Sequence, residues 1–351
     1  MSSVHARVGR RQAGSTAQVS LQSSVVSSTS AGREHVISGG ESVKNGPVNE
    51  RDISTHHIRA VLGYFRYFSY PVTVDELWYF TPVKSSRSRV QKIVEKLVVE
   101  GEVIKIGNRG QYALGGHGIS VDARSRGALN SSNIRREGEM FLKFLSYMPW
   151  IELVGISGSC AMDNATALDD LDVFIVSAPG RIWLARLTAI ISAKVLARHR
   201  TYSDVAQNQA SHKICLNLFF DALHMTVPKS RQSLYTAHEV VQMRPVVIRG
   251  GAYEKFLHAN SWVKSYFPNV SFDMQIQNSG RDVRDGMIYE VSDGTSGRWS
   301  SIYLPGSLLE KCARWLQLKL MHTPTSETIT DEQLWFFPHD FSERLRSKMP
   351  L

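Results

Sequence analysis

Residues 151–176 read IELVGISGSCAMDNATALDDLDVFIV and form the most informative segment of the chain. Residues 150–156 and 171–176 are apolar runs with the length and composition of buried strands. Between them lies a turn that contains Gly158 and Ser159. The stretch therefore predicts two strands of a buried sheet, with a glycine-serine turn directly after the first.

The turn has the residue types of a phosphate-binding loop. A helix that starts after Ser159 would leave backbone N–H groups pointing at the turn, and such groups bind anions. Gly158 lets the backbone approach a triphosphate closely, and the Ser159 hydroxyl can add a hydrogen bond. Glycine-serine turns also occur in many unrelated loops, so the meaning of this one depends on the residues that follow.

Two acids open the second strand. Because strand side chains alternate between faces, Asp170 and Asp172 are expected to project from one side, while Leu171 and Val173 face the core. Two carboxylates at that separation repel each other unless a cation lies between them, and Mg²⁺ or Mn²⁺ prefers such ligands. The pattern predicts a metal site at Asp170 and Asp172. The alternative is a helix N-cap or a solvated strand edge.

Together, the turn at Gly158 and Ser159 and the Asp-x-Asp strand at Asp170 and Asp172 resemble the signature of the nucleotidyltransferase superfamily. The similarity extends over about residues 53–268. Within the superfamily, the chain resembles a bacterial subgroup with an N-terminal winged helix. It implies an α+β fold, with a nucleotidyltransferase-like mixed sheet flanked by helices, an N-terminal winged-helix domain and a C-terminal helical region. It also implies that the aspartates are catalytic metal ligands, and that the turn holds a nucleoside triphosphate such as ATP.

The third acid of this superfamily is not found where it is expected. It usually comes from a following strand, where it binds metal or helps to deprotonate the attacking hydroxyl. The corresponding strand is expected at 214–220, and its polar position is Asn217, which carries no charge and cannot act as a base. Asp221 has the same strand parity but lies roughly 13 Å further along. Catalysis is therefore expected to be weakened, altered or absent.

Basic residues near the motif could bind the nucleotide phosphates. Lys213 directly precedes the expected strand at 214–220, and we assign it to the triphosphate. Arg181 and Arg186, which follow the aspartate strand, could also reach a phosphate. Surface salt bridges are the alternative for all three residues.

Residues 51–118 predict a winged helix-turn-helix. Three helices are expected, at 53–68, from Val74 onward, and over 90–98, where apolar residues recur at the spacing of a half-buried helix. Two strands joined by a glycine-containing turn follow at 102–106 and 111–114.

The third of these helices is basic on its polar face, which carries Arg89, Lys92 and Lys96. Such a helix can enter a DNA major groove, with lysine and arginine contacting phosphates. A solvated face, a protein-docking surface or an internal packing domain is the alternative.

The patterns divide the chain into a disordered tail at 1–50, the winged helix at 51–118, a nucleotidyltransferase-like core at 135–230, a helical region at 231–325 and a tail at 326–351. The tail at 1–50 has no aromatic residue and cannot bury enough apolar area to order itself, although an organellar presequence has a similar composition. The polar segment from 118 to 135 is the expected domain boundary. Residues 271–300 lose periodicity and are expected to form a loop.

Composition narrows the class of protein. The 351 residues include 42% hydrophobic and 21% charged residues, as in a globular protein. No apolar run approaches the roughly 20 residues of a membrane helix, so no membrane partner is expected. The net charge of +9 favours polyanionic partners. The 3 cysteines are far apart, which predicts neither disulfides nor a structural zinc site and suits a reducing cytoplasm.

Two functions are consistent with these features. The first is a cytoplasmic Mg²⁺-dependent (or Mn²⁺-dependent) nucleotidyltransferase, which moves a nucleoside monophosphate from a nucleoside triphosphate to a hydroxyl on a protein, a nucleic acid or a small molecule. The alternative is a DNA-binding regulator or scaffold whose nucleotidyltransferase-like domain is catalytically inactive. A modifier of a partner protein that resembles an antitoxin is a further variant of the first.

Overall fold

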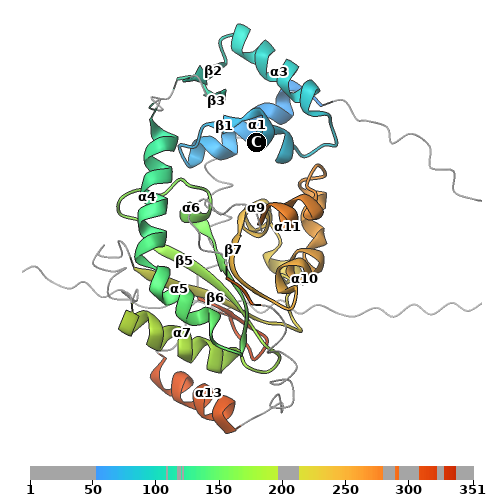
Figure 1. Ribbon diagram of the computed structural model, residues 1–351. Coiled ribbons are helices and arrows are strands. Elements are labelled where there is room, and N and C mark those ends of the chain that lie inside the picture. Colours follow the sequence, from blue (N-terminus) through green and yellow to red (C-terminus); the bar gives the residue numbers. More distant parts are fainter. Residues whose placement is uncertain are drawn as a thin grey trace, which may run out of the picture. The chain divides into compact units, whose positions relative to one another are not determined.

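The computed structural model describes residues 53–107, 110–116, 120, 122–196, 213–279, 289–291, 308–321 and 328–336 (Figure 1). All of these described residues belong to one compact unit. This part of the chain combines helices with a 3-stranded and a 7-stranded sheet, in agreement with the expected α+β class. The expectations for 1–50, a disordered tail or a presequence, lie outside the described residues.

Residues 53–116, here called the N-terminal module, hold three helices and a small sheet. The helices are α1 (Thr55–Tyr67), α2 (Val74–Tyr79) and α3 (Arg87–Val99), and the strands are β1 (Val72–Thr73), β2 (Val103–Ile106) and β3 (Gln111–Leu114). Strand β3 pairs antiparallel with both β1 and β2. The helices and the β2–β3 pair were expected from the sequence. Strand β1 was not expected, because a strand of two residues is too short to show an alternation of apolar and polar side chains.

Local capping explains where these helices begin and end. Helix α2 starts with a capping box, in which the Thr73 N–H donates to Glu76 Oε2 at 2.7 Å and the Glu76 N–H donates to Thr73 Oγ1 at 3.2 Å. Helix α3 begins after Ser86, whose hydroxyl accepts from the Arg89 N–H. It stops before Gly101, whose φ of 77° lies in the left-handed region that glycine adopts freely.

The large sheet is mixed and has the strand order β8-β7-β4-β5-β6-β10-β9. Its strands are β4 (Ile151–Ile156), β5 (Leu171–Ser177), β6 (Ile214–Asp221), β7 (Arg244–Arg249), β8 (Tyr289–Val291), β9 (Thr328–Ile329) and β10 (Gln333–Trp335). Strands β5 and β6 run parallel, as do β7 and β8, whereas the other neighbours are antiparallel. The three strands β4, β5 and β6 lie where the sequence predicted them.

Each face of this sheet packs against a different set of elements (Figure 1). Val173 and Ile175 point into a core that includes residues of α5 (Glu139–Ser146), α7 (Ile182–Leu196) and α13 (Leu308–Leu320). Phe174 and Val176 point the other way, into a core shared with α9 (Leu234–Gln242), α10 (Ala252–Ala259) and the N-terminal module. The alternation along β5 therefore decides which side chains face the module.

Specific contacts fix the N-terminal module to the rest of this unit. The Tyr64 ring stacks on the His238 ring, with centroids 3.8 Å apart and an interplanar angle of 9°. The Asn269 side chain donates to the Trp78 carbonyl at 2.9 Å and to the Val83 carbonyl at 3.0 Å. The Arg124 guanidinium pairs with Glu76 at 2.7 Å. The module is thus held through both buried rings and polar bonds.

Helix α4 (Ala123–Glu137) occupies the segment where the sequence suggested a domain boundary. Its buried positions are Gly127, Ser131, Ile134 and Arg135. A Cβ on Gly127 would lie 2.8 Å from the Asp163 carbonyl oxygen, so helix and loop meet backbone to backbone. In α4, small and charged residues occupy most of the buried positions that apolar residues occupy in other helices. The sequence pattern therefore did not indicate this helix.

The C-terminal half also departs from the expectation of a helical region followed by a tail. Strand β7 pairs with β4 inside the sheet, and β10, from the expected tail at 326–351, pairs with β6. Part of the expected loop at 271–300 is helix α11 (Phe272–Ser279). Both strands pair with partners that are distant in the sequence, so their place in the sheet could not be predicted from the local pattern.

Candidate functional site

The turn after β4 is shaped by Asp172. The Ser157 N–H donates to the Asp172 carbonyl at 3.0 Å, which joins the turn to the start of β5. Gly158 has a φ of 64°, and a Cβ at that position would lie 2.6 Å from Asp172 Oδ2. Only glycine combines this backbone conformation with the close approach of a carboxylate. The turn therefore lies in direct contact with Asp172.

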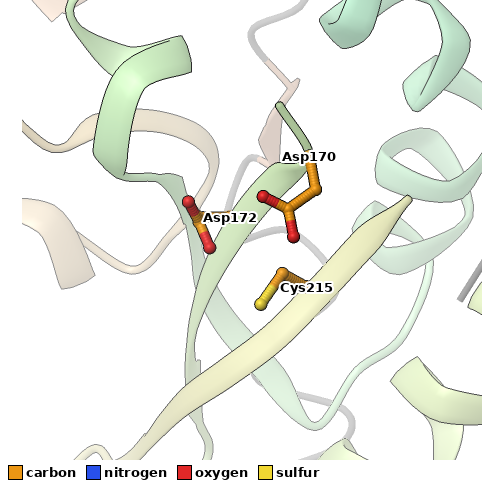
Figure 2. Close-up of side chains that lie close together, drawn as sticks. All are labelled: Asp170, Asp172 and Cys215. Carbon is orange, nitrogen blue, oxygen red and sulfur yellow. The ribbon is translucent and has the colours of Figure 1, made fainter. Parts of the chain in front are cut away.

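Asp170 and Asp172 form a cluster with Cys215 (Figure 2). One potential ligand atom from each residue lies within 4.8 Å of the others. The two acids come from the start of β5, and Cys215 stands opposite Asp172 on β6. Leu171 and Val173 are buried in the opposite core, as the alternation predicted. Cys215 was not predicted at this site, because its neighbours depend on the pairing of β6 with β5.

Asn217 also lies beside the acids. The register between β5 and β6 shifts at this point, so that Leu216 pairs with Val173 but Leu218 pairs with Phe174, and Asn217 is the extra residue. Its side-chain amide donates to Asp172 Oδ1 at 3.1 Å. Asn217 therefore holds a carboxylate in place rather than adding a charge.

Asp221 has a separate, structural role at the far end of β6. Its carboxylate is buried and accepts from the Gly180 N–H at 2.6 Å and from the Leu223 N–H at 2.9 Å. These bonds fix the turns that follow β5 and β6. The expectation that Asp221 cannot replace a third acid agrees with this placement.

The donor set can be compared with the metals that the sequence predicted. The paired carboxylates of Asp170 and Asp172 suit Mg²⁺ and Mn²⁺, which favour oxygen ligands. The thiol of Cys215 would favour a softer ion. The two acids alone fit a site that keeps several waters and takes further oxygens from a phosphate, as Mg²⁺ sites do. Bound there, the ion would offset charge that develops on a reacting phosphate.

Glu239 is a site residue that the sequence analysis did not select. It lies on α9, and its carboxylate accepts hydrogen bonds from the Gly158 N–H and from the Tyr235 hydroxyl. Burial raises the pKa of Glu239, although these two bonds oppose the rise. Burial and the nearby charge of Glu239 raise the pKa of Tyr235 well above its usual value. A carboxyl group of the chain thus already touches the predicted phosphate-binding turn.

His238, the neighbour of Glu239, belongs to the core. Its ring is 2% exposed and contacts the rings of Tyr64, Phe65, Phe80 and Phe267. Burial lowers the pKa of His238 well below its ordinary value, so the ring is neutral. The two adjacent residues of α9 therefore have different roles: His238 packs in the core, and Glu239 lies at the site.

Ser159 is engaged within the loop rather than pointing a free hydroxyl at a ligand. Its Oγ donates to Asp169 Oδ2 at 2.7 Å, and the Thr166 hydroxyl donates to Asp169 Oδ1 at 2.6 Å. Asp169 therefore closes the loop that delivers Asp170 to the site. A phosphate contact by the Ser159 hydroxyl would have to replace its bond to Asp169.

An ion-pair network around Asp163 anchors the loop between the turn and β5; in it Arg135 is buried, and Asp163 and Arg244 are partly exposed. Asp163, with a φ of 53°, accepts from Arg135 Nη1 at 2.8 Å and from Arg244 Nη2 at 3.1 Å. Arg135 Nη1 also donates to the Cys160 carbonyl at 2.6 Å. Three separate elements, α4, the loop and β7, are locked together at the base of the site.

A pocket of about 310 Å³ lies beside the turn and the acids. Its polar side includes Gly158, Ser159, Asp169, Asp170, Asp172 and Glu239. Its aromatic side is built by Tyr64, Phe65, Phe68, Tyr70 and Tyr235. Four of these five rings come from the N-terminal module, so the module and the sheet enclose the pocket jointly.

The remaining residues chosen from the sequence lie outside this lining. Lys213 precedes β6, and its carbonyl accepts from the Leu171 N–H at 2.8 Å. Arg186 Nη1 donates to Gln317 Oε1 at 2.7 Å on the opposite face of the sheet. On α3, Arg89 is half-buried, and Lys92 and Lys96 are exposed.

Comparisons with protein-family models, with curated proteins and with solved structures found no match. The resemblance to nucleotidyltransferases therefore depends on the residues quoted above. Among the described helices, none has the length and hydropathy needed to cross a bilayer.

Proposed function

We propose that the protein is a Mg²⁺- or Mn²⁺-dependent nucleotidyltransferase that moves a nucleoside monophosphate from a nucleoside triphosphate to a hydroxyl acceptor. The observation that carries the proposal is the meeting of Asp170 and Asp172 with the Gly158 turn at one side of a pocket. Acids that converge in a pocket favour an active site over a structural ion pair.

The reaction assigns a role to each group. The acceptor oxygen attacks the α-phosphorus and forms a new O–P bond, and the bond from that phosphorus to the β-phosphate oxygen breaks, so that pyrophosphate leaves with the electron pair. Asp170 and Asp172 would hold the cation that offsets the charge on these oxygens. The hydroxyl proton passes to a base of the pocket, and we assign this role to Glu239, whose pKa burial raises.

The first test removes the metal ligands. The double variant Asp170→Asn, Asp172→Asn keeps the size of both side chains but removes their charges, so we expect it to lose Mg²⁺-dependent binding of ATP or CTP in calorimetry. Transfer from α-labelled nucleoside triphosphates, measured as pyrophosphate release or as labelling of the protein itself, should disappear with it.

Asp273→Asn is the matched control, because Asp273 is an exposed acid on α11. It should bind nucleotide like the wild type. Equal metal-dependent nucleotide binding by the double variant and the wild type would refute the assignment.

A DNA-binding regulator is the second candidate, and the exposure of Lys92 and Lys96 on α3 favours it. The charge of this face is partly offset, since Lys96 lies 3.6 Å from Glu100. If the face binds DNA, the triple variant Arg89→Ala, Lys92→Ala, Lys96→Ala should shift duplex DNA at least about 10-fold less well in a gel assay, because phosphate contacts supply most of the affinity. Unchanged binding in this variant would exclude α3 as the contact. The proposed transferase activity should not depend on these three residues.

A further inference from the structure

The aromatic side of the pocket comes mainly from the N-terminal module, as defined above. Tyr64, Phe65, Phe68 and Tyr70 face the same pocket as Asp170 and Asp172. We propose that this aromatic wall is a subsite for the planar base of the nucleotide, which makes the N-terminal module part of the substrate site. This inference depends on the proposed function.

The backbone at the end of α1 presents the wall. Ser69 has a φ of 51°, in the left-handed region, and this turn brings the Tyr70 N–H back to the Phe65 carbonyl at 3.0 Å. The Phe68 carbonyl accepts from Asn164 Nδ2 at 3.0 Å. Asn164 belongs to the loop that leads to Asp170. The end of α1 is therefore tied directly to the segment that carries the acids.

The rings of the wall are held in place before any ligand binds. The Tyr64 ring stacks on His238 and lies 5.3 Å from the Phe68 ring, measured between centroids. The Tyr70 hydroxyl donates to Glu76 Oε1 at 2.6 Å, and the Arg124 guanidinium lies 4.3 Å from the centre of the Tyr70 ring. Rings fixed in this way lose little freedom when a ligand stacks on them.

Phe68 is the ring best placed to meet a ligand. Tyr64, Phe65 and Tyr70 are buried, whereas Phe68 is only half-buried and lines the pocket. Its neighbour Tyr67 lies 5.0 Å away between ring centroids and does not belong to the pocket lining. The two adjacent aromatic residues thus form a natural pair of test and control positions.

The two sides of the pocket require a ligand with two kinds of surface. The carboxylates call for a cation with anionic oxygens, and the aromatic wall calls for a flat ring. Asn164, Glu239 and Gln242 add polar groups around the same space, where the edge of a heterocycle can form hydrogen bonds. A nucleoside triphosphate carries all three features in one molecule. At about 310 Å³, the pocket is at the small end of small-molecule sites and suits a nucleoside with its phosphates directed to the acids.

The test compares a nucleotide with its phosphate chain alone. Binding of Mn²⁺-tripolyphosphate and of Mn²⁺ complexes of ATP, CTP, GTP and UTP is measured by calorimetry on the full chain. The wild type should bind at least one nucleotide roughly 10-fold more tightly than tripolyphosphate, because stacking of a base on an aromatic ring contributes to affinity. Phe68→Ala should remove that difference and leave tripolyphosphate binding unchanged. Tyr67→Ala should behave like the wild type.

The outcomes separate the two proposals. If the wild type binds neither tripolyphosphate nor any of the nucleotides, the proposed function is wrong and the subsite is overturned with it. If it binds tripolyphosphate as tightly as every nucleotide, or if Phe68→Ala keeps the nucleotide preference, the subsite alone is overturned. Should Phe68→Ala fail to fold in a thermal melt, Phe68→Leu keeps an apolar side chain without the ring and is held to the same criterion.

Discussion

Replacing Arg135 with methionine is expected to lower the free energy of unfolding by about 3 kcal/mol. The Arg135 side chain is 4% exposed and serves both the Asp163 carboxylate and the Cys160 carbonyl. Methionine keeps a long side chain but removes the donors, so Asp163 loses a buried partner and a buried carbonyl is left without this bond. Urea unfolding followed by tryptophan fluorescence measures the change.

Arg244→Met is the matched comparison, because Arg244 bonds to the other oxygen of the same Asp163 carboxylate. The Arg244 side chain is 21% exposed, so water can compensate for part of the loss. We expect this variant to lose about 1 kcal/mol. Equal losses in the two variants would contradict the view that burial of Arg135 makes it the main anchor.

Gly158→Ala is expected to weaken Mn²⁺ binding roughly 10-fold or more while leaving the protein folded. An added Cβ would lie 2.6 Å from Asp172 Oδ2, so the carboxylate must move away from the turn. The cation would then lose one of its two acidic ligands in the required position. Titration of Mn²⁺ followed by electron paramagnetic resonance measures this change directly.

Gly180→Ala separates this effect from backbone strain. Gly180 has a φ of 66°, close to that of Gly158, but no atom lies within 4 Å of the position of its Cβ. Both variants should therefore lose about 1 kcal/mol of stability from the left-handed backbone. Only Gly158→Ala should lose Mn²⁺ affinity. Similar Mn²⁺ affinity in the two variants would show that the contact between Gly158 and Asp172 does not shape the site.

Arg135 and Gly158 act on neighbouring parts of the segment between β4 and β5. The Arg135 network anchors Asp163, at the start of the loop that ends in Asp170. Gly158 then sets how closely Asp172 approaches the turn after β4. Stability and cation binding are therefore expected to be linked through this loop, and Arg135→Met should also weaken Mn²⁺ binding to a smaller degree than Gly158→Ala.

The sequence predicted the centre of the fold and the first part of the candidate site. Apolar runs located β4, β5 and β6, and a helical period located α1 and α3. It did not indicate α4, whose buried positions include Gly127, Ser131 and Arg135. It also missed β7 and β10, which acquire their meaning only when they pair with β4 and β6. Periodicity reports burial by apolar side chains, whereas α4 is packed largely by small and charged residues, and the place of β7 and β10 depends on partners distant in the sequence.

What the sequence determined alone is the common direction of Asp170 and Asp172, because residues two apart on a strand share a face whatever surrounds the strand. Only the tertiary structure decided which groups meet them. The β5–β6 register brings Cys215 and Asn217 to Asp172, and the packing of α9 brings Glu239 to Gly158. The aromatic wall likewise exists because the end of α1 packs against that loop. Contacts between segments distant in the chain have no local period, so the physical chemistry of the site was fixed by packing.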